Sequence, residues 1–499
     1  MSLVYPSLYQ INTRVWLREL AETLGRPATL NDVPDYYLDG VAELGFDYVW
    51  FLGVWQTGPA GRAVSLSNPA LLEECRRSLP DFKEEDVSGS PFAVRSYAVH
   101  EDFGGPQALE NLRGRLALRG LRLILDFVPN HTAPDHPWVF SHPEYYVQGR
   151  SEDLRREPYN YRAVETGQGP LILAYGRDPY FSGWPDTFQL NYRHPGLRAA
   201  MAVELEKIAG LADGVRCDMA MLILPEIFDR TWGERSQPPD DSLPLDEPFW
   251  PEAIRRVKEK NPDFLFMAEV YWDLEWALMQ QGFDYAYDKR LYDRLEAQAA
   301  SAVRRHLLAD PEYQRRSIRF LENHDEPRAA ATFPPAVHQA AAVVAFFLPG
   351  LRFFHEGQLE GRRIKISMHL GRRPREPVAA DLEEFYQWLL AVLKRAEVRS
   401  GRWRLLETCP AWEGNPTGEQ FLCWAWEGTP DSRLLVAVNY GPLRGQTFVT
   451  WPFEPDGLFR LRDLLGPYRY EREGADLADR GLYLDMPEWG YHAFEVKSI

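Results

Sequence analysis

Eight short apolar runs, each ending in polar residues, recur between Ser7 and Gln358. Near-continuous hydrophobicity over about four to six residues is typical of strands that are buried on both faces, as in parallel sheets. Segments with Leu at helical spacing lie between several of these runs, at Pro106–Gly120, His194–Ala212 and Pro251–Pro262. The predicted strands lie in Ser7–Trp16, Phe46–Trp55, Leu121–His131, Asp213–Leu222, Phe264–Trp272, Gly282–Lys289, Ser317–Asp325 and Gly350–Gln358.

Strands that alternate with helices in this way predict an α/β fold, a (β/α)8 TIM barrel with insertions. A stretch rich in Pro, Gly and Tyr follows the third run and predicts an inserted subdomain. Two further long loops, after the second and fourth runs, are expected to cover the mouth of the barrel. From about Gly401 the pattern changes to strands and turns, which predicts an antiparallel β-sandwich. The predicted domains are the barrel (1–131 and 193–399), subdomain B (132–192) and the C-terminal domain (400–499).

Composition narrows the range of partners. A chain of 499 residues is too long for one hydrophobic core, so more than one domain is expected. The net charge is 56 − 73 = −17, which argues against a nucleic-acid partner because phosphate binding needs a basic face. The chain holds 16 Trp and 24 Tyr, and such side chains stack well on sugar rings. The acidic balance therefore favours a small neutral carbohydrate as the substrate.

The cysteines and the N-terminus indicate in which cellular compartment the protein is expected. Cys75, Cys217, Cys409 and Cys423 are scattered, without the spacing of a metal site. The N-terminus lacks a basic segment followed by an apolar one, and no apolar run reaches the length of a membrane span. We expect a reduced cytoplasmic protein without a membrane partner, while the oligomeric state stays open.

The ends of the fourth and fifth predicted strands carry the main candidate chemistry. Side chains alternate along a strand, so Arg216 and Asp218 share a face, and the guanidinium should keep the carboxylate ionised. An ionised, oriented carboxylate suits a nucleophile. Glu269 ends a strand in apolar surroundings, which should raise its pKa and suit it to general acid catalysis. One charged and one protonated carboxyl group are the pair that retaining glycosidases use.

Two other strand ends add polar groups that could hold sugar hydroxyls. Asp126, Asn130 and His131 accompany the third strand, and His324 and Asp325 follow the seventh. A single acidic residue at such a position commonly caps a helix, and a single histidine is commonly structural. The hypothesis therefore depends on four strand ends of one barrel carrying suitable groups together.

The chain resembles the α-amylase family, glycoside hydrolase family 13, over essentially its whole length. The resemblance is carried by the motifs DFVPNH (126–131), GVRCDMAML (214–222), AEVY (268–271) and ENHDE (322–326). Each motif alone is weak, whereas the four in this order are specific.

The resemblance implies a role for each matching residue. Asp218 is the implied nucleophile, Glu269 the acid/base, and Asp325 the group that binds hydroxyls of the distorted ring. Arg216 pairs with the nucleophile. The implied substrate-binding residues also include His131, His324 and Asp126, and Phe92 in GSPFAV stands where the family usually has a tyrosine.

Two departures from the family pattern concern metal and acceptor binding. Met221 and Leu222 replace a Lys-His pair whose histidine carbonyl commonly helps bind a structural calcium in the family. Asn130, another usual calcium ligand, is kept. No cofactor is required by this prediction, and a structural calcium at Asn130 remains an alternative.

The leading hypothesis is a retaining α-glycosidase for short α-glucans or α-glucosides. The alternative is a transglycosidase, in which a sugar, a polyol or phosphate replaces water as the acceptor. Met221 and Leu222 would exclude water better than Lys-His, and the Gly-Arg-Arg triplets at 361–363 and 371–373 are candidates for binding phosphate. A catalytically inactive sugar-binding scaffold is the third possibility, against which the presence of all three carboxylates argues.

Overall fold

The computed structural model describes residues 5–166, 169–236, 247–428 and 432–499. Eight parallel strands close into a barrel. Each strand pairs with the barrel strands before and after it in the chain, and the first strand pairs with the last. The predicted TIM barrel is confirmed. The barrel strands are β1 (Ser7–Asn12), β2 (Tyr48–Leu52), β5 (Arg122–Phe127), β11 (Gly214–Cys217), β12 (Leu265–Ala268), β13 (Tyr285–Tyr287), β14 (Ser317–Arg319) and β15 (Leu351–His355).

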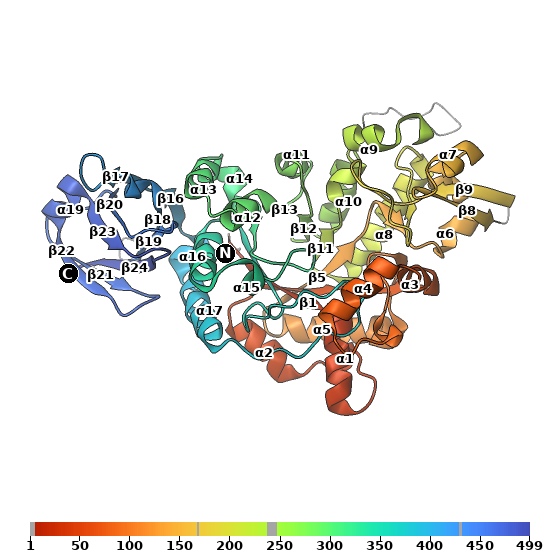
Figure 1. Cartoon of the computed structure of the whole chain (residues 1–499), viewed down its shortest axis with the longest axis horizontal. Coiled ribbons are helices and arrows are strands. Elements are labelled where there is room, and N and C mark those ends of the chain that lie inside the picture. Colours follow the sequence, from red (N-terminus) through yellow and green to blue (C-terminus); the bar gives the residue numbers. More distant parts are fainter. Residues whose placement is uncertain (1–4, 167–168, 237–246, 429–431) are drawn as a thin grey trace.

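Helices follow the barrel strands and cover their outer face (Figure 1). The first predicted strand run is longer than β1, because the side chain of Asn12 caps the following helix by accepting a hydrogen bond from Val15 N. Among the surrounding helices are α1 (Thr13–Leu24), α2 (Asp35–Glu43), α5 (Gly105–Ala117), α8 (Pro195–Leu211), α10 (Trp250–Lys260), α12 (Lys289–Glu296), α13 (Ala300–Leu307), α16 (Pro335–Phe347) and α17 (Ala380–Leu393).

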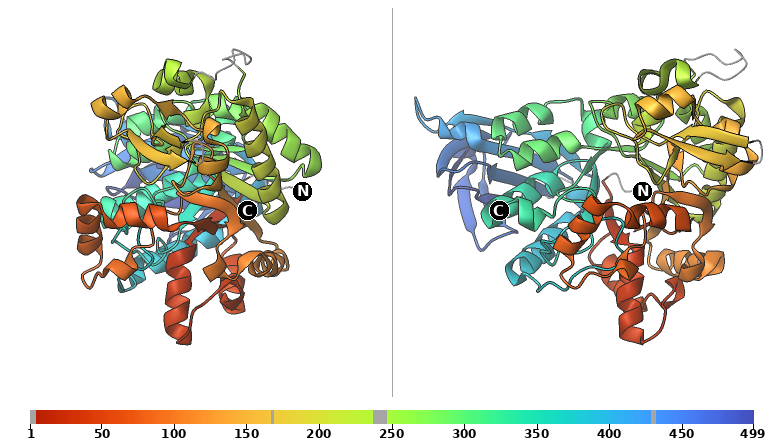
Figure 2. Two further views of the ribbon diagram at one scale, coloured as in Figure 1. Left: turned by 90° about the vertical axis from the view of Figure 1, so that its right-hand side faces the viewer. Right: turned by 45° about the vertical axis from the view of Figure 1, so that its right-hand side comes forward.

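The segment between β5 and α8 forms a small unit of its own. Its strands make a three-stranded antiparallel sheet and a separate two-stranded pair. This unit lies beside the residues after β11, where Arg177 donates a hydrogen bond to Thr231 O, and the two are neighbours in both views of Figure 2. The elements of the unit are β6 (His131–Thr132), α6 (Pro137–Ser141), β7 (Gln148–Gly149), α7 (Ser151–Arg156), β8 (Tyr161–Thr166), β9 (Gly169–Ala174) and β10 (Phe188–Gln189), and the neighbouring helix after β11 is α9 (Pro225–Trp232).

The loops predicted to cover the barrel mouth contain short elements. The loop after β2 forms β3 (Trp55–Thr57), α3 (Pro59–Leu66), α4 (Pro69–Ser78) and β4 (Val94–Val99). The loop after β11 continues through α9, and residues 237–246 of it lie outside the described residues. Among the described residues, no helix combines the length and the apolar character needed to cross a bilayer.

The C-terminal region holds two antiparallel sheets, as predicted, at the opposite end of the barrel from β8 and β9 (Figure 1). Side chains of the central strand alternate, so that Trp424 and Trp426 pack into the barrel core while Cys423 and Ala425 face the smaller sheet. The sheets are β16 (Arg402–Leu405), β18 (Phe421–Glu427), β19 (Arg433–Asn439), β24 (Tyr491–Ser498), β21 (Leu458–Asp463) and β22 (Arg469–Glu473), then β17 (Glu407–Pro410), β20 (Gly445–Thr450) and β23 (Leu482–Met486).

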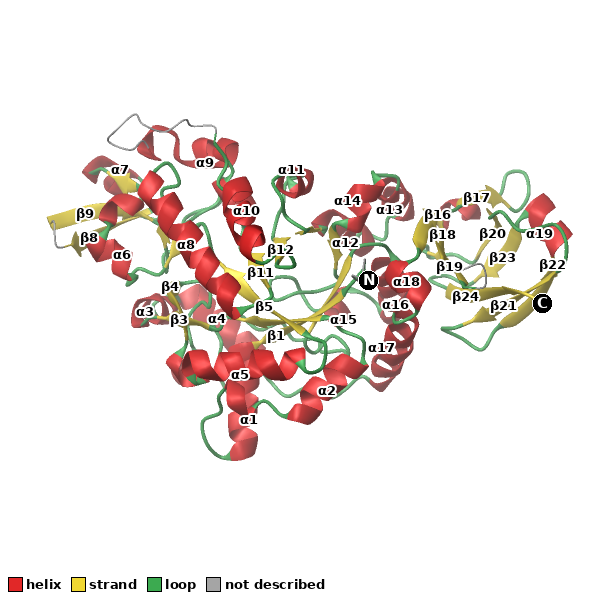
Figure 3. Ribbon diagram, turned by 180° about the vertical axis from the view of Figure 1, so that it is seen from behind, coloured by secondary structure: helices red, strands yellow, loops and turns green. Residues whose placement is uncertain are grey.

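The central strands β18 and β19 of the larger sheet are therefore buried on both faces. Helices α16 and α17 lie between it and the barrel strands in the view from behind (Figure 3). The indole N–H groups of Trp424 and Trp426 both donate to Phe347 O at the end of α16, at 3.0 and 2.8 Å. Barrel and C-terminal sheet thus share a continuous apolar core.

Candidate active site

The register of the barrel strands places the candidate carboxylates at one level. Cys217 pairs with Ala268 across β11 and β12. Asp218 and Glu269 directly follow these two residues, so they leave neighbouring strands at the same height. They lie at the C-terminal end of the barrel, which is the face where this fold places its chemistry.

One guanidinium joins the three carboxylates. Arg216 Nη1 lies 2.5 Å from Asp218 Oδ1, and Nη2 lies 2.8 Å from Glu269 Oε2 and 3.9 Å from Asp325 Oδ2. The Arg216 side chain is completely buried, while that of Asp325 is 42% exposed. The planar fork of arginine can serve two carboxylates at once, which the point charge of a lysine cannot. Arg216 therefore fixes Asp218 and Glu269 relative to each other, and Asp325 forms the open side of the group.

Aromatic rings surround this guanidinium. The Arg216 Cζ atom lies 5.3 Å from the ring centroids of both Trp50 and Phe92, and 5.8 Å from that of Tyr287. Guanidinium groups bind favourably to the faces of aromatic rings at such distances. The rings also exclude water, which strengthens the ion pairs of Arg216.

Burial keeps Glu269 protonated at neutral pH. Desolvation is the largest influence and raises the pKa of Glu269 to about 8; the charges of Asp218 and Asp325 add to this, and Arg216 opposes it. The predicted direction of this shift agrees with the structure. A carboxyl group that holds its proton at neutral pH can donate it to a leaving oxygen.

Two hydrogen bonds orient the Glu269 carboxyl group. Met219 N donates to Oε2 at 2.6 Å, and the Tyr271 hydroxyl donates to Oε1 at 2.9 Å. Met219 has a left-handed backbone, with φ 41°, which is rare for a residue with a side chain. This conformation turns the chain immediately after Asp218 and directs the Met219 N–H towards Glu269.

The surroundings of Asp325 lower its pKa, whereas those of Glu269 raise its pKa. Desolvation acts to raise its pKa, but the neighbouring His324, Arg216 and Lys365 together hold the pKa of Asp325 below its usual value. His324 Nε2 lies 3.0 Å from Asp325 Oδ2. Gln10 Nε2 lies 2.9 Å from His324 Nδ1, an arrangement that places the ring proton on Nε2. Asp325 is therefore an ionised carboxylate beside a protonated Glu269.

The remaining acidic residues of ENHDE support the loop. Glu322 Oε1 accepts from Arg328 Nη1 at 2.6 Å, and Oε2 accepts from Ala329 N at 2.7 Å. Glu326 Oε1 lies 3.1 Å from Lys289 Nζ. Glu322 is buried with Arg328, whereas the side chain of Asp325 is partly exposed.

His131 and Phe92 lie at the edge of the same group. His131 has a hydrogen bond with the backbone of Phe92, and burial lowers the pKa of its imidazole. Its ring centroid is 5.3 Å from that of Trp184. The Phe92 ring is 5.4 Å from that of His324. The structure thus gathers six predicted residues in one group with Arg216: Asp218, Glu269, Asp325, His324, Phe92 and His131.

Asp126 occupies a different position from the one expected for a sugar ligand. Its side chain is buried, with Oδ1 accepting from Trp50 Nε1 at 3.0 Å and Oδ2 from Gly53 N at 2.7 Å. Burial raises the pKa of this carboxyl group to about 6. Because both oxygens already accept hydrogen bonds from the protein, Asp126 supports Trp50 and the turn at Gly53.

Met221, Leu222 and the second Gly-Arg-Arg triplet suggested a transferase, but their contacts in the structure are with the protein itself. Met221 and Leu222 are buried in the barrel core, so the argument that they exclude water from an acceptor subsite loses its basis. Arg372 pairs with Asp86 at 2.8 Å, and Arg373 pairs with Glu356 at 2.7 Å. The second Gly-Arg-Arg triplet is thus committed to carboxylates of the protein.

The surroundings of Asn130 do not fit the calcium ion that the family pattern implies. The side-chain nitrogen of Gln189 lies 2.9 Å from both Asn130 O and Asn130 Oδ1, and 3.1 Å from Leu190 O. Calcium is bound by oxygen ligands, and here an N–H donor stands among three of them. The described residues also contain no group of three His, Cys, Asp or Glu side chains that could hold a metal.

Several contact residues were missed by the sequence analysis. Tyr271 could have been found, because it lies two positions after Glu269 and shares its side of the chain. Trp50 and Tyr287 lie in predicted strands, but strand patterns do not indicate which apolar side chains meet Arg216. Gln10 and Lys365 come from remote parts of the sequence and carry no local signal.

Comparisons with known proteins agree with this geometry. Residues 38–376, more than half of the chain, match the family described as the catalytic domain of alpha amylase. Alpha-amylase 3 of Dictyoglomus thermophilum is 26% identical over 284 residues, which is 52% of each chain. The alpha-1,4-glucan:maltose-1-phosphate maltosyltransferase of Burkholderia pseudomallei is 26% identical over 277 residues, 54% of this chain and 20% of that protein.

The chain spans about half the length, or less, of these curated relatives. Among solved structures, a noncanonic maltogenic alpha-amylase from Thermotoga neapolitana has the same fold, with a TM-score of 0.69 and 16% identity over the whole of both chains. The family match, the barrel and the arrangement of carboxylates at its C-terminal end lead to one conclusion. The chain belongs to the alpha-amylase family.

Proposed function

We propose that this protein is a retaining α-glycosidase that cleaves α-glucosidic bonds of short α-glucans or α-glucosides. The proposal depends on one observation: two carboxyl groups bind the same guanidinium but lie in different electrostatic environments. Asp218 is held by Arg216 at 2.5 Å, whereas burial keeps Glu269 protonated. A nucleophile and an acid held side by side are what double displacement at a sugar carbon requires.

In the first step, Asp218 attacks the anomeric carbon and Glu269 protonates the leaving oxygen. Asp218 Oδ1 is held by Arg216, so we assign the attack to Oδ2. The bond from carbon to the leaving oxygen breaks, and that oxygen takes the Glu269 proton together with the bonding electrons. The product is a glucosyl ester on Asp218 and an ionised Glu269.

In the second step, water attacks the same carbon and gives its proton to Glu269. The ester bond breaks and returns the electrons to Asp218. Two inversions give net retention of the anomeric configuration. Asp325 and His324 are assigned to the hydroxyls of the ring, where an ionised carboxylate and an imidazole N–H can accept and donate hydrogen bonds.

A sugar hydroxyl in place of water would give transfer instead of hydrolysis. The similarity to a protein named as a maltosyltransferase supports this second candidate. Both candidates share the first step and the residues assigned to it. They differ only in the acceptor, which the substrate experiment separates.

The proposal is tested with maltose, maltotriose, isomaltose, sucrose, trehalose and soluble starch, each followed by product analysis. Action on short glucosides is expected, with glucose as a product of hydrolysis or larger sugars as products of transfer. Rapid random cleavage of starch without action on the short sugars would contradict the substrate assignment.

Asp218→Asn should lower kcat by several orders of magnitude with an unchanged melting temperature. Asp229→Asn is a matched control, since Asp229 is an exposed residue of α9 paired with Arg193. That control should retain full activity. Unchanged activity of Asp218→Asn would remove the central assignment.

A further inference from the structure

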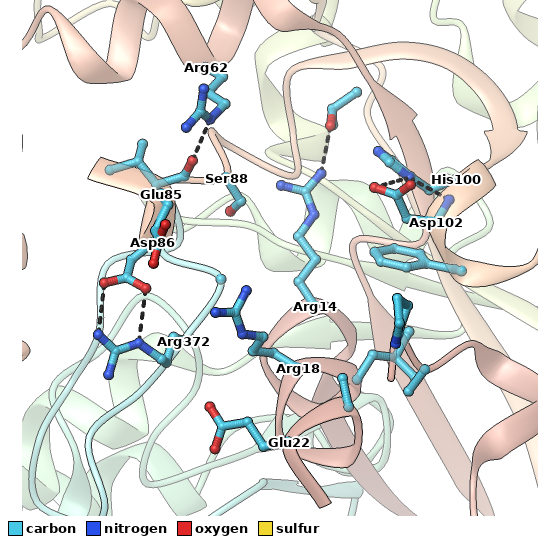
Figure 4. Close-up of a pocket in the computed structure, with 18 of the residues that line it drawn as sticks. Arg14, Arg18, Glu22, Arg62, Glu85, Asp86, Ser88, His100, Asp102 and Arg372 are labelled. Atoms are coloured by element: carbon cyan, nitrogen blue, oxygen red, sulfur yellow. Dashed lines mark hydrogen bonds and ion pairs between the residues drawn. The ribbon is translucent and has the colours of Figure 1, made fainter. Parts of the chain in front are cut away.

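A cavity of about 800 Å³ lies beside α1, separate from the carboxylates of the active site. Its walls come from α1, from α3 and from the chain around Asp86 and Arg372 (Figure 4). None of the active-site residues assigned above lines it. Cavities of this size are typical of sites for small organic molecules.

Three arginines face this cavity. Arg14 and Arg18 extend from α1, and Arg62 approaches from the opposite side, on α3 (Figure 4). Among the described residues, no carboxylate oxygen lies within 4.0 Å of any of these guanidinium groups. Four arginines and four carboxylates line the cavity, so its formal charges balance, although the protein as a whole carries a net charge of −17.

Neutral groups hold two of these arginines in place. Arg14 donates from Nη1 to Gly89 O at 2.9 Å and from Nη2 to Thr57 Oγ1 at 2.8 Å. Arg62 donates from Nε to Val87 O at 2.7 Å. Burial lowers the pKa of Arg14 to about 10, so it remains charged at neutral pH. Both bonds of Arg14 go to neutral acceptors, and the carboxylates whose charges act on Arg14, those of Asp102 and Asp126, lie more than 4.0 Å away.

The acidic residues on the cavity wall have basic neighbours of their own. Arg372 is their strongest partner, with Nη2 at 2.8 Å from Asp86 Oδ2. Glu22 and Glu85 lie within 4.0 Å of Arg375 and Lys83. Asp102 lies 3.7 Å from His100, whose pKa burial lowers, so the charge of Asp102 acts mainly on Arg14 from a greater distance. Among the described residues, none of these carboxylates makes a direct ion pair with Arg14, Arg18 or Arg62, so the three guanidinium groups can still bind the oxygens of a ligand.

The rest of the lining fits a molecule with an organic part. Leu17, Ala21, Pro27 and Phe103 supply an apolar wall, while Ser88 is polar. A bare anion would fill only a fraction of the volume. Guanidinium forks match the oxygens of phosphate groups, since they can donate two parallel hydrogen bonds.

We propose that this cavity binds a small organic phosphate, with its phosphate group between Arg14, Arg18 and Arg62 and its organic part against the apolar wall. The site is independent of the proposed glycosidase activity, because the two share no residues. The ligand is distinct from a substrate of the carboxylate site, which has no free arginine.

Isothermal titration of the full chain with glucose 6-phosphate tests the proposal, with glucose, inorganic phosphate and citrate as comparison ligands. We expect saturable binding of glucose 6-phosphate, weaker binding of inorganic phosphate and none of glucose. Binding should weaken in 0.5 M NaCl, as expected for exposed charges. Binding of glucose as tight as that of its phosphate, or preference for citrate, would overturn the ligand class.

Arg18→Gln and Arg62→Gln are the decisive variants, since both side chains are exposed. Because Arg62 also donates to Val87 O and Glu84 O, the melting temperature of each variant is measured to confirm that it folds. Each should weaken the binding of glucose 6-phosphate about tenfold or more, because a hydrogen bond to a charged group is lost. Arg305→Gln, an exposed arginine of α13, is the matched control and should bind as the wild type does.

The inactive Asp218→Asn protein should also bind glucose 6-phosphate with unchanged affinity, which separates this proposal from the proposed function. Wild-type affinity in both Arg18→Gln and Arg62→Gln, or no binding to the wild type at millimolar concentration, would overturn the proposal. Loss of binding in Asp218→Asn would assign the ligand to the active site and overturn it as well.

Discussion

Arg216 is the residue on which the arrangement of the active site depends. It is completely buried, surrounded by aromatic rings, and touches both Asp218 and Glu269. A single cation near two carboxyl groups would normally ionise both. The deeper burial of Glu269 prevents this, because desolvation outweighs the pull of Arg216 on its pKa. Packing around one side chain thus keeps Glu269 protonated while Arg216 holds Asp218 beside it.

The raised pKa of Glu269 has a measurable consequence. Glu269 must be protonated to act as the acid, so kcat/KM should fall as the pH rises through about 8. In Glu269→Gln this basic limb should disappear. Its activity should fall about 100- to 10,000-fold on maltose, and much less on α-glucosyl fluoride, whose leaving group needs no proton. A pH profile with the same basic limb in the variant would exclude Glu269 as the titrating group.

Glu322 and Glu326 differ sharply in their expected contributions to stability. Removing one partner of a buried ion pair costs about 3–5 kcal/mol, since the other charge is left unpaired. Glu322→Ala leaves Arg328 buried without its carboxylate, so its melting temperature should fall by many degrees. Glu326→Ala is the matched control in the same loop, and its partner Lys289 also pairs with Asp293. Thermal unfolding of both variants distinguishes them, and equal losses would contradict the assignment.

At the scale of the elements, the pairing of β6 with β10 places a hydrogen-bonded amide beside Asn130, the residue that the family pattern links to calcium. Gln189 on β10 donates to the oxygens of Asn130, which precedes β6. We therefore expect a chelator to leave the melting temperature of the wild type unchanged. Differential scanning fluorimetry with and without EDTA measures this directly. A large fall on adding EDTA would contradict the absence of calcium at this position.

A substitution at Gln189 sharpens this test. Gln189→Glu would place a carboxylate among three oxygens, so the variant should be less stable than the wild type and should recover on adding millimolar calcium. Gln189→Leu is the matched control. It should also be destabilised, because it removes the buried hydrogen bonds, but calcium should have no effect on it.

The sequence predicted those strands well that form a continuous run of apolar residues. The eight barrel strands lie within the predicted runs, and Asp218, Glu269 and Asp325 meet as their places at strand ends suggested. Strands β16, β17 and β22 were missed, because exposed edge strands with many polar residues lack a continuous apolar run. Strand β21 was missed because its apolar residues alternate with arginines.

Side-chain partners were the least predictable feature. The bonds of Asp126 to Trp50 and Gly53 depend on the distance between β2 and β5, which no local pattern fixes. The same holds for the ion pair of Glu326 with Lys289. Such contacts join residues that are remote in the sequence, and they appear only when the barrel closes.

At the scale of the whole molecule, the C-terminal sheets complete the barrel. Trp424 and Trp426 bury their rings against it and donate to the end of α16. Truncation after Ser400 would expose the apolar surface that these rings cover. We expect the truncated chain to aggregate or to melt at a much lower temperature, as measured by sedimentation and calorimetry. A soluble truncated barrel with the melting temperature of the full chain would show that the two regions are independent.

The central claim is double displacement through Asp218, and the configuration of the first product tests it most directly. Proton NMR can follow the anomeric signals during the first minutes of cleavage of the best substrate, before mutarotation mixes them. Retention predicts that the α-anomer appears first and that the β-anomer grows only as the solution equilibrates. A β-anomer as the initial product would mean a single displacement by water, and it would contradict the assignment of Asp218 as the nucleophile.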